Sequence, residues 1–284
     1  MHGIHYLALL GAVLAVSSSA LFIRIATAPP LVIAAYRMLI VAALLLPVAA
    51  IVQRADLSRL NRGDMAKLAT AGIFLAAHFG LWTASLQYTS VASSVVLVST
   101  HPILVALLEA AWLGRRVPRL GQAGIALTVL GGVIVANDEL RRSGANGLGA
   151  SLALGGALAM VGYLLIGRSV RAHLGFIAYS APVYAVCALV LVMSASITGD
   201  SFMVSGSDLG IFVALALVPT ICGHTLFNWT LRHVPASAVA TAFLGEPVGA
   251  AFLAWLLLSE APGITTLAGG SVILLGLLIT VKSV

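Results

Sequence analysis

Long apolar stretches alternate with short polar connections along the whole chain, and this pattern predicts its secondary structure. The stretches run to about 20 residues, which is long enough for a helix to cross a hydrocarbon layer roughly 30 Å thick. Proline, glycine and charged clusters separate ten of them, which we expect as helices at residues 4–26, 30–52, 66–87, 91–113, 120–137, 147–169, 175–197, 208–231, 236–258 and 264–281. Because most connections are only a few residues long, neighbouring helices should be antiparallel.

The composition places these helices in a membrane. Hydrophobic residues make up 61% of the 284 residues and charged residues only 8%, whereas soluble domains carry roughly a quarter charged residues. The apolar runs lack the alternation of polar and apolar positions that a membrane β-barrel strand shows. The sequence therefore predicts an all-α polytopic membrane protein with ten transmembrane helices.

The basic residues predict how the chain is oriented. With a cytoplasmic N-terminus, the connections on the cytoplasmic side hold eleven of the 15 basic residues, namely Arg54, Arg59, Arg62, Lys67, Arg115, Arg116, Arg119, Arg168, Arg171, Arg232 and Lys282. An excess of Lys and Arg marks cytoplasmic loops. We therefore expect both termini in the cytoplasm of a bacterial cell, with the chain in its inner membrane. The net charge of +6 is spread over these loops and does not indicate a nucleic-acid partner.

An internal repeat is visible when the sequence is shifted by 145 residues. The shift places Pro102 on Pro247, and it aligns Gly124 with Gly269 and Gly131 with Gly276. Proline and glycine mark backbone features rather than mere apolarity, so their coincidence at one shift is informative. We expect a first five-helix repeat at residues 1–140 and a second at 141–284. Five is odd, so the second repeat should be inverted, as in transporters with a substrate site near the membrane midplane.

Two charged residues lie well inside the predicted spans. A charged side chain at the bilayer centre costs roughly 2.5 to 3.5 kcal/mol on insertion scales, so each needs a partner or a polar cavity. Arg37 is either a fixed positive charge for a substrate carboxylate or the structural partner of a buried glutamate. Glu246 is a candidate for contact with a substrate ammonium group. Arg24 and Glu109 lie nearer the ends of their spans, where they are expected to reach the interface.

Other polar and aromatic residues are candidates for the lining of the same cavity. His78 and Trp82 are one helical turn apart and share a face, and His224 and Asn228 repeat that spacing. His101 occupies the position that Glu246 holds in the other repeat. A histidine in a membrane span also serves as an interhelical hydrogen-bond donor, and that alternative stays open for each of them.

Aromatic residues and prolines complete the set of candidates. Tyr163 and Trp82 are possible walls or gates of the cavity, and each could equally be core packing. Pro102 and Pro247 each remove one helix hydrogen bond. They are therefore predicted to break the fourth and ninth helices beside the site and to take part in gating.

These features resemble a known family. The arginine in "AAYRMLIVAALLLPV", the five-plus-five pattern and the segment "LGEPVGAAFLAWLLLSEAPG" followed by "AGGSVILLG" are similar to the EamA branch of the drug/metabolite transporter superfamily. The resemblance covers essentially the whole chain and implies a basket of ten helices that exports small metabolites. Aromatic amino-acid exporters of the YddG type are a neighbouring group. The resemblance also implies a cavity lined by His78, Trp82, His101, Tyr163, His224 and Glu246.

The sequence thus predicts a secondary transporter that exports amino acids or related metabolites by alternating access, with no cofactor, metal or catalytic residue. Two alternatives remain at this point. One is a membrane enzyme acting on a lipid or an isoprenoid phosphate, which the short loops disfavour, and the other is an exporter of drugs or cations. The oligomeric state is not predicted, and a monomer is compatible with the pattern.

Overall fold

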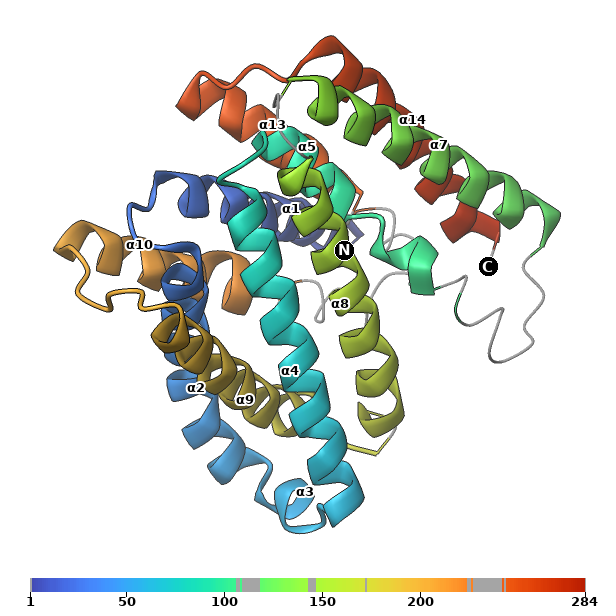
Figure 1. The fold of residues 1–284 in the computed structure, drawn as a ribbon. Helices are drawn as coiled ribbons and strands as arrows, with labels where there is room; N and C mark the ends of the chain where they lie inside the picture. Colours follow the sequence, from blue (N-terminus) through green and yellow to red (C-terminus); the bar gives the residue numbers. More distant parts are fainter. Residues whose placement is uncertain are drawn as a thin grey trace.

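The computed structural model describes residues 2–105, 108, 118–142, 147–171, 173–223, 226, 242 and 244–283. Throughout these ranges the regular elements are helices (Figure 1). They are α1 (His2–Ile25), α2 (Pro30–Val52), α3 (Arg54–Ser58), α4 (Arg62–Ser85), α5 (Val91–Val98), α7 (Arg119–Arg142), α8 (Leu148–Arg171), α9 (Phe176–Ile197), α10 (Gly206–Leu215), the π-helical η1 (Ala216–Gly223), α13 (Gly245–Leu258) and α14 (Ile264–Ser283).

The predicted all-helical membrane fold is confirmed. Seven helical segments are long and apolar enough to cross a membrane, and three shorter apolar helices cover residues 91–105, 245–258 and 264–280. Each of the ten predicted segments therefore overlaps a helix among the described residues. The structure adds a short helix, α3, in the loop after α2, and a π-helical end to α10.

Polar side chains at the segment boundaries explain where several helices begin. Asn61 accepts a hydrogen bond from the Asp64 N–H and Asp64 reaches back to the Asn61 N–H, which is a capping box at the start of α4. The Ser90 and Ser205 hydroxyls each accept a hydrogen bond from a backbone N–H, that of Ser93 at the start of α5 and that of Asp208 at the start of α10. Such caps satisfy backbone N–H groups that have no partner inside the helix.

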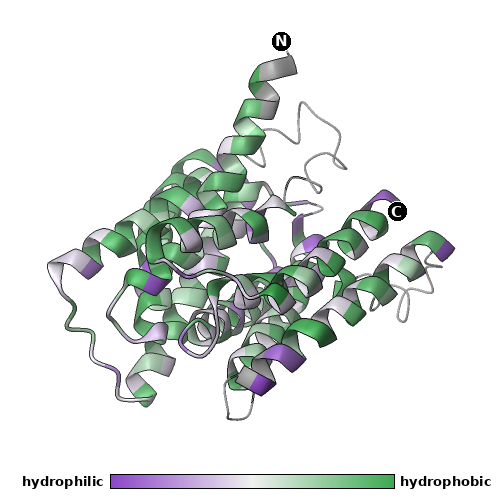
Figure 2. Cartoon of the chain, turned by 90° about the horizontal axis from the view of Figure 1, so that it is seen from above, coloured by the Kyte–Doolittle hydropathy of each residue, from purple (hydrophilic) through white to green (hydrophobic). Residues whose placement is uncertain are grey.

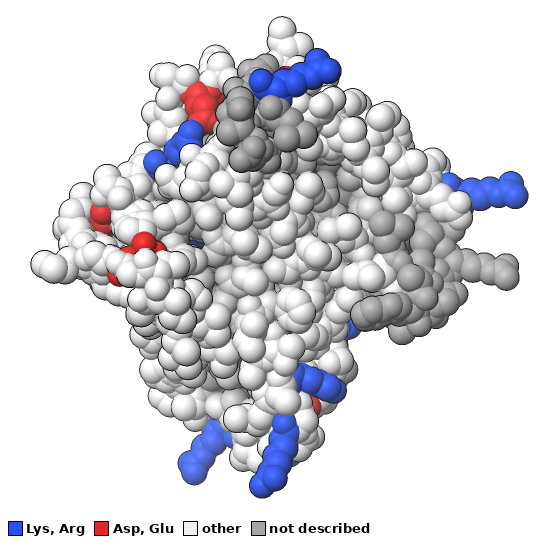
Figure 3. Space-filling model, in the orientation of Figure 1, with Lys and Arg blue, Asp and Glu red and all other residues white. Residues whose placement is uncertain are grey.

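The long helices pack as pairs that join the two halves of the sequence. The most extensive contacts are those between α7 and α14, between α4 and α8, and between α2 and α9. In Figure 1, α7 and α14 run side by side at one corner, while α2, α4, α8 and α9 form the opposite part of the molecule. Apolar residues predominate along the helices in Figure 2. Charged side chains lie around the margin of Figure 3, and the broad middle of that surface carries few of them.

Glycines allow α7 and α14 to approach closely. A Cβ atom on Gly124 would lie 2.6 Å from the Gly276 carbonyl oxygen, and one on Gly131 would lie 2.6 Å from the Gly269 carbonyl oxygen. Close backbone approach at small residues is a common mode of helix packing in membranes. The 145-residue shift pairs Gly124 with Gly269 and Gly131 with Gly276. In the structure this pairing is exchanged, so that Gly124 meets Gly276 and Gly131 meets Gly269. Two equivalent antiparallel helices related by a twofold axis pack in this way.

Two opposite faces can be defined by their loops. The acidic face contains the loops at residues 26–29, 86–90, 198–205 and 259–263, which carry or adjoin Asp200, Asp208 and Glu260. Contacts across this face include the hydrogen bonds from Thr27 to the Asp208 carboxylate, 2.9 Å from its N–H and 2.6 Å from its hydroxyl. The basic face contains the loops at residues 53–61 and 173–175, which are joined by a hydrogen bond from the Gly175 N–H to Asp56.

Candidate functional site

A buried arginine lies where α1, α2, α4 and η1 meet. Arg37, on α2, is only 4% exposed. Its Nε atom donates to the Thr220 hydroxyl at 2.9 Å and its Nη1 atom to the Ser19 hydroxyl at 3.1 Å. The guanidinium carbon lies 4.4 Å from the centre of the Phe79 ring, within the range of a cation–π interaction. Side chains from both halves of the sequence therefore hold this cation.

The hydrogen bonding of Arg37 leaves part of its guanidinium group free. Arginine has five N–H donors, and only Nε and Nη1 have acceptors among the described residues. No carboxylate of the described chain forms an ion pair with Arg37. Glu246 contacts the same segment of α1 as Arg37 does, since the Ser17 hydroxyl donates to the Glu246 carbonyl and the Ser19 hydroxyl accepts from Arg37. A buried cation whose hydrogen bonds within the described ranges go only to hydroxyl groups is suited to an anionic group of a ligand.

The π-helical segment explains how Thr220 comes to face Arg37. Pro219 has no N–H, so the Leu215 carbonyl loses its usual helical donor. The Thr220 hydroxyl donates to that carbonyl at 2.9 Å and accepts from Arg37 at the same time. Single π-helical turns inside transmembrane helices are frequent at functional sites.

His78 and Trp82 form an aromatic wall on α4. Their rings stack with centres 6.1 Å apart, and both residues are buried. His78 Nδ1 lies 2.9 Å from the Gly156 carbonyl of α8. A carbonyl only accepts, so Nδ1 carries the proton. The indole N–H of Trp82 is buried and has no hydrogen-bond partner in the described structure.

His101 and Pro102 follow an interruption of the fourth span. The helix α5 ends at Val98, residues 99 and 100 form a turn, and helical structure resumes over residues 101–105. His101 Nδ1 donates back to the Val98 carbonyl at 3.0 Å.

Glu246 and Pro247 lie in the first turn of α13, which begins at Gly245. A carboxylate there is favourably placed against the positive end of the helix dipole. The Glu246 carbonyl accepts a hydrogen bond of 3.2 Å from the Ser17 hydroxyl of α1. Within the described ranges, its carboxylate oxygens make no hydrogen bond or ion pair. Glu246 is only partly buried, so its carboxylate is available to a ligand.

The structure places Arg37 and His78 on either side of Phe79, with Trp82 stacked on His78. Glu246 and Arg37 contact the same segment of α1, and His101 follows the buried α5. Tyr163 lies on α8, with its ring centre 6.2 Å from that of Tyr179 on α9. It is therefore placed between α8 and α9. His224 and Asn228 lie outside the described residues.

Sequence reasoning missed the residues that hold Arg37. Ser19 was visible only as one of several small residues in the first span, and Thr220 was not distinguished at all. Phe79 follows His78 directly but is apolar, so nothing in its type suggested contact with a cation. The one signal that could have found Thr220 is Pro219, because a proline inside a span frees a carbonyl that a neighbouring hydroxyl can satisfy.

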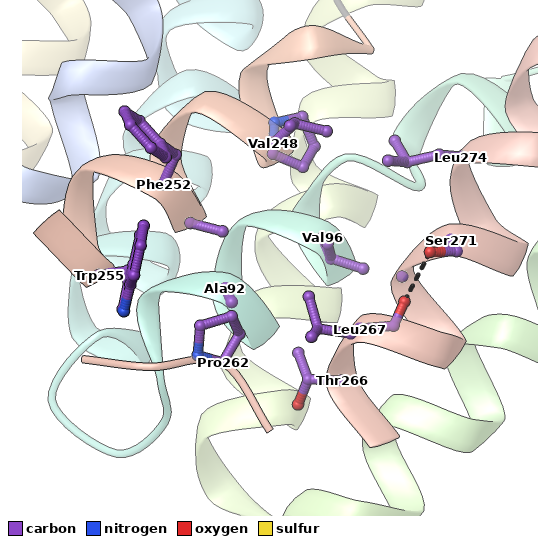
Figure 4. Close-up of a pocket in the computed structure, with 13 residues that line it drawn as sticks. Ala92, Val96, Val248, Phe252, Trp255, Pro262, Thr266, Leu267, Ser271 and Leu274 are labelled. Carbon is purple, nitrogen blue, oxygen red and sulfur yellow. Dashed lines mark hydrogen bonds between the residues drawn. The ribbon is translucent and has the colours of Figure 1, made fainter. Parts of the chain in front are cut away.

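A cavity of about 350 Å³ lies between α5, α13 and α14, with Pro247 in its lining (Figure 4). Its walls are largely apolar and include Val96, Phe252 and Trp255, with only two hydroxyl groups, those of Thr266 and Ser271. Charged or zwitterionic groups would lose hydration there without gaining partners. This cavity is therefore not the candidate site, which remains the cluster around Arg37.

Comparison with known proteins identifies the family. The sequence model of the EamA-like transporter family matches the chain twice, over residues 3–137 and 147–282. The chain is 27% identical to the "Uncharacterized transporter YwfM" of Bacillus subtilis (strain 168) over 210 residues, covering 74% of this chain and 71% of that one. It is also 27% identical over 229 residues to an "Uncharacterized transporter" of Archaeoglobus fulgidus, with 79% and 80% coverage.

A solved structure shares the fold. One crystal structure superimposes with a TM-score of 0.67 over 99% of this chain and 98% of its own, at 18% sequence identity. At that identity the likeness concerns the fold alone. The two family matches span nearly the whole chain, and they favour a transporter over a membrane enzyme. The protein belongs to the EamA-like transporter family.

Proposed function

We propose that this transporter exports amino acids or closely related metabolites through the site around Arg37. The observation that carries the proposal is that one segment of α1 contacts both charged residues, since Arg37 donates to the Ser19 hydroxyl and the Ser17 hydroxyl donates to the Glu246 carbonyl. A zwitterionic substrate needs one cationic and one anionic contact. Arg37 would bind the substrate carboxylate and Glu246 its ammonium group.

The aromatic wall supports a substrate with a flat or apolar side chain. His78 and Trp82 are stacked on α4, and the indole N–H of Trp82 has no hydrogen-bond partner within the described residues. Tyr163 would lie at the side of the same cavity. His224 and Asn228 are proposed to line it as well, by their positions in the eighth span.

Alternating access between two five-helix repeats, at residues 1–140 and 141–284, is proposed as the mechanism. The two family matches and the crossed glycine contacts of α7 and α14 support such repeats. The two halves would rock about the midplane site and open it to one side at a time. The interruption before Pro102 and the start of α13 just before Pro247 are suited to absorb the change in backbone angles.

The proposed location is the inner membrane of a bacterium, with both termini in the cytoplasm. The distribution of Lys and Arg supports this orientation. It places the basic face in the cytoplasm and the acidic face outside. Reaction of an impermeant reagent with a cysteine introduced on each face of intact cells tests it directly.

Replacing Glu246 with Gln tests the role of the carboxylate. We expect counterflow of a labelled amino acid into proteoliposomes to fall about tenfold, since one charge-assisted contact to the ammonium group is lost. Its dependence on pH should flatten at the same time, because a titrating group has been removed. Asp200→Asn, which changes an acid to an amide in a loop, is the matched control and should leave both unchanged. An unaltered rate and pH profile in Glu246→Gln would refute the proposed contact.

The same counterflow assay distinguishes a transporter of amino acids from an exporter of cationic drugs. A buried, permanently charged arginine repels a cation that has no carboxylate to offer. If an organic cation exchanges rapidly while amino acids do not, the substrate proposal fails and the alternative is favoured.

A further inference from the structure

We propose that the side chains of Arg24 and Glu260 close the transport pathway where it opens on the acidic face, the mouth of the pathway. They do so by binding the turn between α4 and α5, and we call this pair of residues the latch. This inference rests on the alternating access proposed above. It concerns two residues outside the candidate site, and it assigns them a role in controlling access to that site.

The two side chains bind each other and the same backbone turn. Glu260 Oε2 lies 3.5 Å from Arg24 Nε, and Glu260 Oε1 accepts a hydrogen bond of 2.6 Å from the Val91 N–H. Arg24 donates from Nη1 to the Leu86 carbonyl. Leu86 directly follows α4 and Val91 begins α5, so the charged pair engages both ends of one turn. Hydrogen bonds from ionised groups are stronger than those between neutral groups.

The latch joins three parts of the molecule that are distant in sequence. Arg24 lies in the last turn of α1, Glu260 in the loop between α13 and α14, and the turn at residues 86–90 between α4 and α5. The contacts of Glu260 thus connect the second half of the chain to the first. For the pathway to open on this face, the turn must separate either from Glu260, which breaks the bond to the Val91 N–H, or from α1, which breaks the bond of Arg24 to the Leu86 carbonyl.

The backbone before Glu260 holds its carboxylate in place. Ser259 has a φ of +56°, in the left-handed region that non-glycine residues rarely adopt. This conformation ends α13, and the Glu260 N–H then bonds to the Ala254 carbonyl at 3.2 Å. A strained residue next to a charged contact persists only when the surrounding structure requires it.

The latch is mechanically connected to the candidate site through α5. All residues from Val91 to Val98 are buried, so this helix is enclosed by its neighbours. The turn that follows it leads directly to His101. A displacement of the Val91 end that opens the mouth would therefore also move His101 relative to Arg37.

The sequence repeat does not preserve this acid. The 145-residue shift pairs Glu260 with Arg115, a residue outside the described part of the chain.

Labelling of a buried reporter cysteine tests the latch. Ala20 is 1% exposed and lies on α1 one turn before Arg24, in the same apolar cluster as Leu86 and Val91. Ala20→Cys is introduced with Cys187 and Cys222 changed to serine, and the protein is placed in lipid nanodiscs with a water-soluble maleimide. We expect slow labelling in this parent and about tenfold faster labelling after Glu260→Ala, which matches the loss of charge-assisted hydrogen bonds.

Controls show whether faster labelling reflects opening of the transport pathway or unfolding of the protein. Asp200→Asn, an acid on the same face that bonds within its own loop, should label at the parent rate. Glu260→Gln should label at an intermediate rate, because its amide oxygen still accepts from the Val91 N–H while its attraction to Arg24 is lost. Labelling in denaturant should be equal in all variants.

The latch is overturned if Glu260→Ala labels at the parent rate. Labelling requires no substrate, so this result would leave the proposed function standing. Conversely, faster labelling together with absent amino-acid counterflow would retain the latch and remove the substrate assignment.

Discussion

Replacing Arg37 with methionine should abolish amino-acid transport without loosening the protein. Counterflow is expected to fall about 100-fold, because the substrate carboxylate loses hydrogen bonds to a charged group worth about 2 to 3 kcal/mol, and each 1.4 kcal/mol is a factor of ten. Methionine retains much of the length of the side chain. A buried cation without a carboxylate partner is costly, so removing it should preserve or raise the thermal unfolding temperature in detergent.

The combination of an inactive and stable variant distinguishes a binding role from a structural one. If Arg37 merely tied α1, α2 and η1 together, Arg37→Met would lower the unfolding temperature along with transport. Thr220→Val is the matched control. It leaves both the Nε of Arg37 and the Leu215 carbonyl without their partner, so it should reduce stability more than Arg37→Met does.

A leucine at Gly131 should prevent stable folding, whereas a leucine at the adjacent Gly132 should be tolerated. A Cβ atom on Gly131 would meet the Gly269 carbonyl at 2.6 Å, but one on Gly132 would have no neighbour within 4 Å. Because both sides of the first contact are backbone, neither can move aside. We expect a loss of about 3 kcal/mol, the upper end of the cost of overpacking, seen as a collapse in folded yield by size-exclusion chromatography.

The equivalent contact between Gly124 and Gly276 offers a second test of how α7 and α14 pack. Gly276, the shift partner of Gly131, packs against Gly124 with a Cβ distance of 2.5 Å to its carbonyl. Gly276→Leu should therefore reproduce the loss seen for Gly131→Leu. Similar folded yields for the Gly131 and Gly132 variants would show that α7 and α14 do not pack as described.

The positions of the helices were largely predictable, because bilayer thickness fixes their length and short connections fix their order. A break at Pro102 stays a prediction from its residue type, and the turn at residues 99 and 100 lies just before it. The π-helical end of α10 could not be predicted from the sequence, since the pairing of Thr220 with the Leu215 carbonyl depends on local backbone geometry. The crossed contacts of Gly124 and Gly131 were also hidden, because the sequence shift gives equivalent residues and not touching ones.

The candidate site was predictable only in part. Charges inside apolar spans identified Arg37 and Glu246, since burying a charge demands a reason. Sequence periodicity carries no information on which hydroxyl group will accept a hydrogen bond from Arg37. Thr220, which does so, lies 183 residues away in the chain. The same holds for the long-range contact of Arg24 with Glu260, where the sequence indicated only that Arg24 could reach an interface.

Competition between a labelled amino acid and its two half-analogues tests the central claim most directly. In counterflow into proteoliposomes, an aromatic amino acid should compete strongly, while the amine without the carboxylate and the acid without the amino group should each compete at least about tenfold less. In Arg37→Met, the advantage of the amino acid over the amine should disappear. Equal competition by the amine and the amino acid in the wild-type protein would contradict the claim that Arg37 binds a substrate carboxylate.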